Sequence, residues 1–463
     1  MKAHAPRAKA RHYCSPAALL GAGIAALMLL AGAPARAATY TWTGTGTAAA
    51  ARNWFTGSNW SGGSVPLATD MVIINSVNGP VLDSVSATAA NIQIATAAGA
   101  AGRLELNNAS LATTAANTFI ATQSTGTAFI VMRDSTWTSS SDNINFGNNG
   151  RAVVDLFGSS TINITGGDTG LAQNATASAV MTMNDSSVWI GRNTVHIGLR
   201  GSGTLFMNDN SSLLAGAAAG NNFTIGGNSA TTGRGWMEAA DAARITAAGF
   251  ARIGMQGTGV LILRDSATMT ANAGVFLGMT AVTGSGAVTV ADSAMLRSGA
   301  GFTIGENGAG VLTLRDGGAV QVASGTVVLA RLGAASGRLE ITGSRGGVIT
   351  GTGAMGAAVI DGGPGTGGAR VVFAHGDANY VFANRLAGTL SVEHTGAGFT
   401  TLTGANDYTG GTIVRGGTLA GTTDSVRGDI TADGAVVLDV AAPGRTLALS
   451  GSGLFNKTGP GTL

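Results

Sequence analysis

Aspartate residues recur at nearly constant intervals through the middle of the chain, and their carboxylates are the groups whose spacing could support chemistry. Six of them follow short apolar segments: Asp185, Asp209, Asp241, Asp265, Asp292 and Asp316. A stacked row of carboxylates could bind Ca²⁺, and a pair could cleave a glycosidic bond. An active site would need these residues at one place, whereas each of them stands at the same position of its own repeat. We therefore expect turn residues whose carboxylates accept local backbone N–H bonds.

The other chemical patterns are isolated. Beyond residue 37 the chain has three histidines, His196, His375 and His394. His375 and Asp377 could form a metal-binding or acid–base pair, but the surrounding AHGDANY segment is typical of a turn. The DTG triplet of aspartic proteases occurs once, at 168–170, without a second copy. Because neither a G-x-S-x-G elbow nor an H-E-x-x-H motif occurs, we expect no catalytic residue, no metal, no cofactor and no enzyme activity.

A short pattern that recurs ten times between about residues 102 and 343 accounts for the aspartate spacing. Each copy ends at a polar or glycine anchor, and the anchors are Asn108, Asp134, Gly158, Asp185, Asp209, Asp241, Asp265, Asp292, Asp316 and Gly343. The residues four and two positions before each anchor are apolar, as Leu261 and Leu263 are, and the residue between them varies. This alternation is typical of a half-buried strand. A second short strand that ends in glycine usually precedes the next copy.

The period indicates a stacked repeat, in which each unit buries its apolar face against its neighbours. Successive anchors are about 24–27 residues apart, and only the interval before Asp241 is longer, so we expect a loop insertion there. Leucine-rich, WD40 and kelch repeats have a different residue order or longer units. We therefore predict an all-β protein, a right-handed parallel β-helix (solenoid) with about 24–27 residues per coil.

Residues 1–37 are predicted to be a secretion signal. Basic residues precede the apolar run Ala17–Ala31, and Ala35–Ala37 matches an A-x-A cleavage pattern. The alternative is a membrane anchor, but the run is shorter than the roughly 20 residues that a membrane span needs. Removal of the signal leaves 21 of the 26 basic residues against 24 acidic ones. The remaining chain lacks the clustered basic surface of a nucleic-acid-binding protein.

The rest of the chain divides into four segments. Residues 38–100 hold three of the six tryptophans and are predicted to cap the open end of the β-helix, with an aromatic sugar-binding platform as the alternative. Residues 101–345 hold the β-helix repeats. Residues 346–368 are glycine-rich, which favours either a flexible break or a run of tight, irregular coils. Residues 369–463 resume the pattern in a different style.

The last segment carries a specific resemblance. The run GANDYTGGTIVRGGTL (404–419), followed by KTGPGTL (457–463), resembles the autotransporter-associated β-strand repeat, also called the passenger-associated transport repeat. The resemblance implies a type V secreted surface protein of a Gram-negative bacterium, whose β-helical passenger is exported through its own C-terminal barrel. The chain departs from that family because no barrel strands follow and the sequence stops within a repeat at Leu463. We therefore expect a truncated chain or a fragment, with the C-terminal barrel missing.

The predicted function rests on this resemblance. We expect a surface-exposed autotransporter passenger that crosses the periplasm, reaches the cell surface or the medium, and serves adhesion or another surface interaction. The alternatives are a β-helical polysaccharide lyase or hydrolase, and a purely structural or export-assisting stalk. The expected partners are a host-cell surface, a matrix surface or a carbohydrate, with no nucleic acid, and the outer membrane only through the missing barrel.

Two kinds of sequence feature are candidates for binding specificity. One is the integrin-type tripeptide Arg427, Gly428 and Asp429, which stands in a turn-like context. The other is irregularity in the repeat, namely the insertion before Asp241 and the loops around residues 343–368.

Overall fold

The computed structural model describes most of the chain beyond the predicted signal peptide. The described residues are 37–462 except for 116–117, 141–142, 218–220, 228–232, 282, 352–357 and 442–446. The predicted signal peptide, apart from Ala37, lies outside them. Residues Ala37–Leu463 form one compact unit, and the following description concerns that unit.

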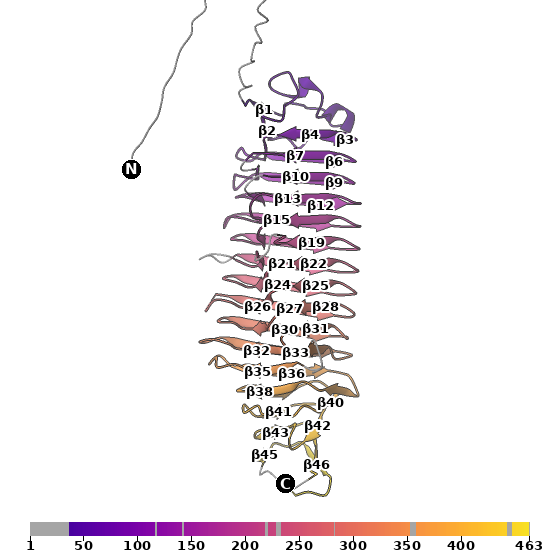
Figure 1. The fold of residues 1–463 in the computed structure, drawn as a ribbon, viewed down its shortest axis with the longest axis vertical. Coiled ribbons are helices and arrows are strands. Elements are labelled where there is room, and N and C mark those ends of the chain that lie inside the picture. Colours follow the sequence, from indigo (N-terminus) through magenta and orange to yellow (C-terminus); the bar gives the residue numbers. More distant parts are fainter. Residues whose placement is uncertain are drawn as a thin grey trace, which may run out of the picture. The chain divides into compact units, whose positions relative to one another are not determined.

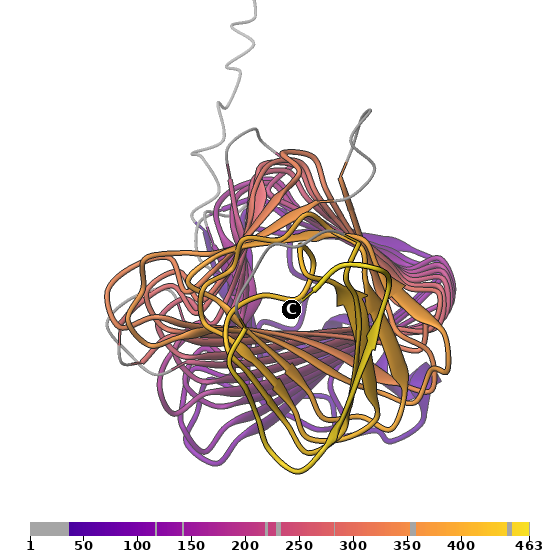
Figure 2. The same ribbon diagram turned by 90° about the horizontal axis from the view of Figure 1, so that it is seen from below.

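The chain winds through successive coils that stack on one another (Figures 1 and 2). A 16-stranded sheet runs along the whole stack. Its strands are β3 (Val81–Asp83), β6 (Ala101–Asn107), β9 (Thr127–Arg133), β12 (Arg151–Phe157), β15 (Ser178–Met183), β18 (Ser202–Met207), β21 (Arg234–Ala239), β24 (Thr258–Leu263), β27 (Ser285–Ala291), β30 (Ala309–Arg315), β33 (Ser336–Gly343), β36 (Ala369–His375), β39 (Ser391–His394), β41 (Thr412–Val414), β43 (Ile430–Ala432) and β45 (Leu449–Ser450).

Two further sheets complete the coils of the repeat region. The 14-stranded sheet consists of β1 (Thr39–Thr41), β2 (Met71–Ile74), β5 (Asn91–Ile94), β8 (Thr118–Ile120), β11 (Ile144–Phe146), β14 (Thr169–Leu171), β17 (Val195–Ile197), β20 (Phe223–Ile225), β23 (Phe250–Ile253), β26 (Gly274–Leu277), β29 (Phe302–Ile304), β32 (Thr326–Leu329), β35 (Val359–Gly362) and β38 (Arg385–Gly388). The 11-stranded sheet consists of β4 (Ser86–Ala89), β7 (Ser110–Thr113), β10 (Thr136–Ser139), β13 (Thr161–Ile164), β16 (Val188–Gly191), β19 (Ser212–Ala215), β22 (Arg244–Ala247), β25 (Thr268–Ala271), β28 (Met295–Ser298), β31 (Ala319–Val322) and β34 (Val348–Gly351).

Each strand pairs in parallel with the strand of the same sheet in the next coil. Thr258 of β24, for example, pairs with Ser285 of β27, and Ser285 pairs in turn with Ala309 of β30. These three residues are spaced along the chain as the anchors Asp265, Asp292 and Asp316 are, so one coil corresponds to one sequence repeat. The prediction of an all-β parallel β-helix with one coil per repeat is therefore confirmed, and its right-handed sense stays a prediction.

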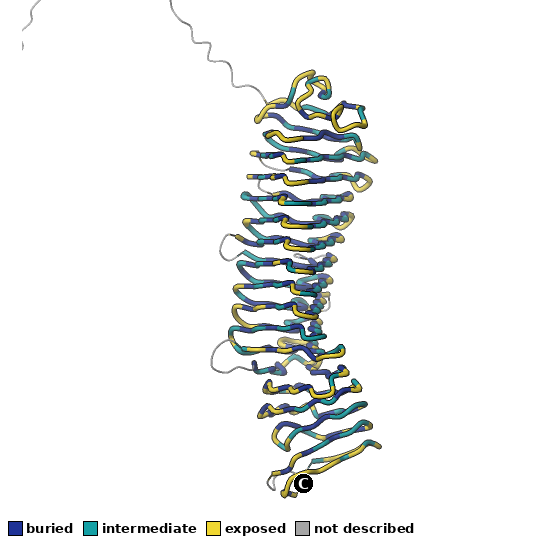
Figure 3. The backbone as a smooth tube through the Cα atoms, turned by 90° about the vertical axis from the view of Figure 1, so that its right-hand side faces the viewer, coloured by how far each residue is buried: buried dark blue, intermediate teal, exposed yellow. Residues whose placement is uncertain are grey.

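The interior of the stack is filled by the apolar rows that the repeat pattern predicted. Leu261 and Leu263 of β24 are fully buried, and so are their equivalents in neighbouring coils, such as Leu312 and Leu314. Buried and partly exposed residues alternate along the strands (Figure 3). One apolar core therefore runs from coil to coil, and each coil is stabilised mainly by the coils on either side of it.

All ten sequence anchors lie at corners where the backbone enters the left-handed region. The φ angle is 58° at Asp185, 59° at Asp265 and 87° at Gly343. Aspartate tolerates this conformation better than most non-glycine residues do. A second left-handed corner follows most short strands of the 14-stranded sheet and is usually glycine, such as Gly254 with φ 69°. The predicted turn positions are thus confirmed.

A cluster of three tryptophans lies in the first part of the stack, and the interpretation of this segment as a cap stays a prediction. Trp42, Trp54 and Trp60 are only 4 %, 1 % and 2 % exposed, and the rings of Trp42 and Trp54 each meet the ring of Trp60 edge to face. The indole N–H groups of Trp42 and Trp60 donate to backbone carbonyls. The short 3-10 helices η1 (Ala49–Arg52) and η2 (Gly57–Asn59) lie in the same segment. Since the three rings are buried, they do not form the sugar-binding platform considered as the alternative.

The solenoid narrows after β36. The 11-stranded sheet ends at β34 and the 14-stranded sheet ends at β38, so these coils keep the 16-stranded sheet and add a smaller one. That 5-stranded sheet consists of β37 (Tyr380–Phe382), β40 (Phe399–Leu402), β42 (Thr418–Thr422), β44 (Ala435–Asp439) and β46 (Leu454–Thr458). Strands β39, β41, β43 and β45 also begin at shorter intervals along the chain than the equivalent strands of the wide coils do. Figure 3 shows these smaller coils below the wider ones.

The glycine-rich segment 346–368 lies where the wide coils end. It contributes β34 and β35 as regular strands, and residues 352–357 between these strands lie outside the described part of the chain. At least the two ends of the segment therefore continue the coils and do not interrupt them.

Candidate functional site

The outward face of the 16-stranded sheet carries two continuous columns of side chains. The strand register places the variable residue of each repeat beside the variable residue of the next repeat. It does the same for the residue two positions before the variable one. The first column is Phe129, Val153, Val180, Thr204, Trp236, Val260, Ala287 and Val311, and the second is Val131, Asp155, Thr182, Phe206, Glu238, Ile262, Thr289 and Thr313. We call this surface the outer face. Most of its members are apolar, and nearly all are partly exposed.

An aromatic pair stands at the centre of the outer face. The rings of Phe206 and Trp236 lie 5.1 Å apart between centroids, tilted by 59°. Beside Trp236 is a shallow surface groove of about 290 Å³, which is lined by Ser202, Gly203, Thr204, Arg234, Gly235, Trp236, Thr258 and Val260. The exposed hydroxyl and guanidinium groups of Ser202, Thr258 and Arg234 border the indole. An aromatic surface with adjacent hydrogen-bonding groups suits an amphipathic ligand.

The N-terminal end of the outer face is charged. Arg52 donates to Glu105 at 2.8 Å, and Arg103 bonds to the same carboxylate oxygen. Burial acts to raise the pKa of Glu105, but these two hydrogen bonds and the charges of the arginines outweigh it and hold the pKa below its ordinary value. Two coils along the second column, burial raises the pKa of Asp155, against the hydrogen bond of Thr182 and the charges of Arg103 and Arg133. The two carboxyl groups thus differ in their affinity for a proton.

The anchor aspartates form a row of corners that is held together between coils. The N–H of Gly158 donates to Asp185 Oδ2 at 2.7 Å, and the N–H of Asp185 donates to Asp209 Oδ2 at 2.9 Å. The same bond recurs between Asp209 and Asp241, at 3.1 Å. The prediction that these carboxylates accept local N–H bonds is therefore wrong, because their partners lie one coil away. Stacking brings each corner directly above the next, which places the donor within reach.

The remaining aspartates of the row also bind the backbone of a neighbouring coil. Asp134 and Asp316 accept the N–H groups of Ser159 and Ser344 at 3.0 Å and 2.9 Å. Within the residues that the structure describes, no three His, Cys, Asp or Glu side chains are grouped as they would be around a metal ion. The row of aspartates therefore links each coil to a neighbouring coil through hydrogen bonds to its backbone.

His196 and the DTG triplet meet across successive coils. The Nδ1 atom of His196 lies 2.6 Å from Thr224 Oγ1, and Nε2 lies 3.8 Å from Asp168 Oδ2. The interaction with His196 lowers the pKa of Asp168. This Thr–His–Asp row has the order of a nucleophile, a base and an acid, but His196 and Thr224 are each only 2 % exposed. A substrate has no access to the hydroxyl group, so the row is structural.

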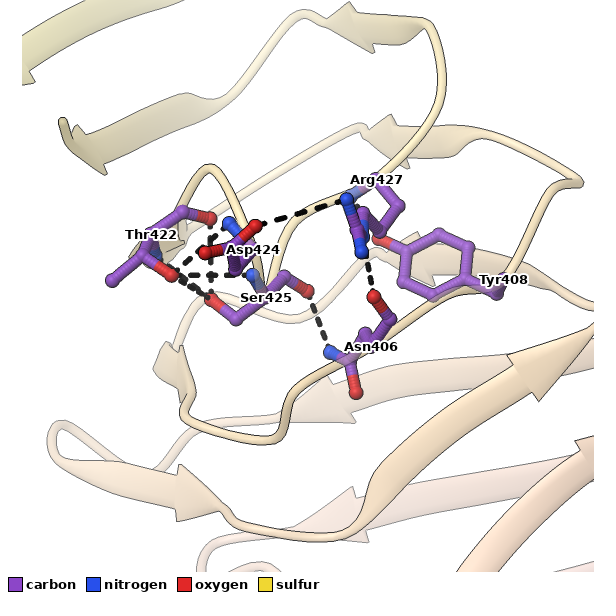
Figure 4. A network of polar contacts seen from close by, with 6 residues as sticks. All are labelled: Asn406, Tyr408, Thr422, Asp424, Ser425 and Arg427. Atoms are coloured by element: carbon purple, nitrogen blue, oxygen red, sulfur yellow. Dashed lines mark hydrogen bonds and ion pairs between the residues drawn. The ribbon is translucent and has the colours of Figure 1, made fainter. Parts of the chain in front are cut away.

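The narrow coils hold a polar network that explains several residues of the C-terminal repeat motif. The side chain of Asn406 is buried and links three coils, because Oδ1 accepts the N–H of Leu386 at 2.7 Å and Nδ2 donates to the carbonyl of Ser425 at 2.6 Å. The hydroxyl of Tyr408 accepts the N–H of Arg427 at 2.9 Å and contacts Thr412 Oγ1 at 2.7 Å. Burial raises the pKa of Tyr408. Figure 4 shows the side chains of Asn406 and Tyr408 beside Arg427 and Ser425 at one corner.

The three residues of the candidate tripeptide have different surroundings at this corner. The guanidinium of Arg427 bonds to the backbone carbonyl of Asn406 and lies 3.9 Å from Asp424, and its side chain is only 14 % exposed (Figure 4). Gly428 has a left-handed φ of 68°. Asp429 is exposed, and its backbone carbonyl accepts the N–H of Thr412 at 2.9 Å. Arg427 therefore belongs to the framework of the narrow coils.

The sequence match is confined to these same coils. Residues 393–420 match the family model of the passenger-associated-transport-repeat. The matched segment is such a repeat, and it is carried on a parallel β-solenoid. A passenger-associated transport repeat on a parallel β-solenoid is consistent with an autotransporter passenger. The repeat also points to secretion by the autotransporter pathway.

The other comparisons return nothing. No curated protein and no solved structure is significantly similar to the chain. In the described ranges of residues 37–462, no helix has the length and apolar character needed to cross a membrane.

The repeat pattern placed the variable residue of each copy, which is Phe206 in the copy that ends at Asp209, on the outward side of its strand. It did not include the column two positions earlier, which holds Trp236, five positions before Asp241. The meeting of these two rings was therefore missed, although aligning that earlier position as well would have indicated an exposed column. The irregular parts that were expected to hold specificity lie partly outside the described residues, at 218–220, 228–232 and 352–357.

Proposed function

We propose that this passenger-type β-helix is an adhesin, whose outer face binds carbohydrate on a host-cell or matrix surface. The observation that carries the proposal is the aromatic pair Phe206 and Trp236, which is partly exposed within two aligned columns of apolar side chains. The C–H faces of a sugar ring pack on an indole, and its hydroxyls need hydrogen-bonding groups around that ring. Arg234 and Thr258 stand beside Trp236.

The geometry of the columns also suits a polymer. Equivalent side chains on adjacent coils repeat at roughly 4.8 Å, the spacing of paired strands. A chain of sugars that lies along the outer face would meet Val180, Thr204, Trp236 and Val260 in succession. An extended ligand can thus gain affinity from many weak contacts around one aromatic anchor.

Binding to a glycan panel tests the proposal. We expect Trp236→Ala to weaken binding about tenfold or more, as the loss of an aromatic anchor at the centre of an interface does. Phe276→Ala is the matched control, since Phe276 is a partly exposed aromatic residue on the outward side of β26 in the 14-stranded sheet. Equal affinity of both variants, with unchanged melting temperatures, would contradict the proposal and favour a stalk without a ligand.

A glycoside hydrolase is the second candidate, and the outer face offers one observation in its favour. Glu105 pairs with Val131, and Val131 pairs with Asp155. The two carboxyl groups therefore lie two coils apart in one column, roughly 10 Å by strand spacing, and their pKa values are shifted in opposite directions. An inverting glycosidase uses a protonated and an ionised carboxyl at comparable separation. The test is whether the protein releases new reducing ends from a glycan of the panel. If it does, and if Asp155→Asn abolishes the release, glycoside hydrolysis would be favoured over adhesion.

A further inference from the structure

The point where the solenoid narrows contains a buried aromatic and histidine cluster. Phe373 and His375 of β36, Tyr380 of β37 and His394 of β39 are at most 7 % exposed. Ring centroids are 5.9 Å apart between the two histidines and 4.7 Å apart between His375 and Tyr380. Two imidazoles therefore sit in the core at the only junction between wide and narrow coils that the described residues contain.

A single hydrogen-bonded chain runs through both imidazoles. The N–H of Asp377 donates to His375 Nδ1 at 3.2 Å, and His375 Nε2 lies 2.8 Å from Thr400 Oγ1. The same hydroxyl lies 3.1 Å from His394 Nε2, and His394 Nδ1 lies 2.8 Å from the carbonyl of Gly416. The chain thus connects the loop after β36, the coil of β39 and β40, and the coil after β41.

The groups at the two ends of this hydrogen-bonded series determine which nitrogen of each imidazole carries the proton. A backbone N–H faces His375 Nδ1, so His375 carries its proton on Nε2 and donates to Thr400. A carbonyl faces His394 Nδ1, so that nitrogen carries the proton, and Nε2 accepts the hydroxyl proton of Thr400. Each donor meets one acceptor only when both rings are neutral. A proton added to His375 Nδ1 would face the N–H of Asp377, and one added to His394 Nε2 would compete with the hydroxyl of Thr400.

Few groups near the cluster favour an imidazolium. The hydroxyl of Tyr380 points elsewhere, to the carbonyl of Gly347. Burial lowers the pKa of His375 to about 4, with help from the neighbouring His394, and the charge of Asp377 opposes this only in part. Burial also lowers the pKa of His394, against the carbonyl of Gly416. In the described part of the chain, the titratable and polar groups that face the two histidines are Asp377, Tyr380, Thr400 and the carbonyl of Gly416.

We propose that this cluster, His375, Thr400 and His394, is an acid-sensitive joint at which the narrow passenger-type coils separate from the wide coils when the imidazoles are protonated. The sign follows from linkage. A histidine whose folded pKa is depressed contributes stability above its unfolded pKa of about 6.5, and that stability is lost as the pH falls toward the folded pKa. This loss of stability is therefore expected between about pH 6.5 and about pH 4. The joint goes beyond adhesion, because it sets the conditions under which the coils stay stacked.

Hydrogen exchange of the full chain, read by mass spectrometry and corrected for intrinsic rates, tests the joint. Between pH 6.5 and 4 we expect amides of residues 391–421 to lose protection by roughly 100-fold or more, as a pKa lowered from 6.5 to about 4 implies. Amides of residues 285–315, deep in the wide coils, should keep their protection over the same window. Equal retention in both segments at pH 4, or earlier loss in 285–315, would overturn the proposal.

Variants separate the joint from general acid unfolding. The double variant His375→Gln and His394→Gln removes both titrating rings, so residues 391–421 should stay protected to lower pH. His196→Gln is the matched control, because His196 is similarly buried but lies in the wide coils, and it should leave the window of residues 391–421 unchanged. If residues 391–421 of the double variant lost protection over the same pH range as in the wild type, the proposal of an acid-sensitive joint would be refuted. The wild-type comparison decides the question if the double variant does not fold.

Discussion

At the scale of residues, Asp185 has two tasks at its corner. Its backbone lies in the left-handed region with φ 58°, and its carboxylate accepts the N–H of Gly158 in the preceding coil. The type and position of this residue indicated a turn, which is what the structure contains. The partner one coil away was not apparent, because local turn chemistry explained the same residue equally well.

The two tasks can be measured separately. We expect Asp185→Ala to lower the free energy of unfolding by about 1–2 kcal/mol, because it loses an acceptor and strains the left-handed corner. Asp185→Asn keeps an acceptor and tolerates the corner, so it should cost about half as much or less. Urea unfolding checks both variants, and Asp429→Ala, at an exposed aspartate, is the control, with an expected change below about 0.5 kcal/mol. Equal stabilities of the two Asp185 variants would contradict the intercoil role of the carboxylate.

At the scale of elements, the open end of the stack needs a closure, and the buried tryptophan cluster is our candidate for it. Trp42, Trp54 and Trp60 cover the first coils, and the indole N–H groups of Trp42 and Trp60 are satisfied on the backbone. Composition alone left two interpretations of this segment, a cap or a sugar platform. Burial separates these interpretations, and burial depends on neighbours that the sequence does not specify.

Removing the central ring should open this end. Trp60 contacts both other tryptophans, so we expect Trp60→Ala to cost about 3–5 kcal/mol, as aromatic truncations in cores do. Hydrogen exchange should become faster in β2 and β5 before it does so in β24. Phe55→Ala is the control, since Phe55 is 44 % exposed and its loss should change little. Loss of protection that spreads evenly along the chain would argue against a local cap.

At the scale of the whole molecule, the wide section behaves as a one-dimensional stack. Each coil contributes one strand to each of three sheets and contacts mainly its two neighbours. The binding columns of the outer face and the corner row exist only because equivalent residues stack. Stability is therefore expected to be a sum over coils and their interfaces, with the joint near β36 as the one change of cross-section among the described coils.

Deletion of a complete coil tests this modularity. Removing residues 258–284 joins Gly257 to Ser285, which is the residue that pairs with Thr258, so every corner and core row stays in register. We expect a folded β protein that unfolds cooperatively, with a modest loss of stability, by circular dichroism and urea titration. Deletion of residues 258–271 is the control, because it removes part of a coil and should disrupt the stack. Loss of cooperative unfolding in the first deletion would contradict the modular description.

The sequence by itself determined the coil period, the inward rows, the corner positions and the kinship of the C-terminal repeat. The period, rows and corners follow from alternation and turn propensity, which act between residues close in the chain, and the kinship follows from the motif at 404–419. Only the tertiary structure decided that Trp236 and Phe206 meet on an exposed face, that Arg427 is bound into a corner, and that His375 and His394 share one hydroxyl. These outcomes depend on which residues stack between coils and on where the cross-section narrows. The contacts of Phe206 with Trp236, of Asn406 with Arg427 and of His375 with Thr400 join residues 30, 21 and 25 positions apart, and they form only when the coils are built.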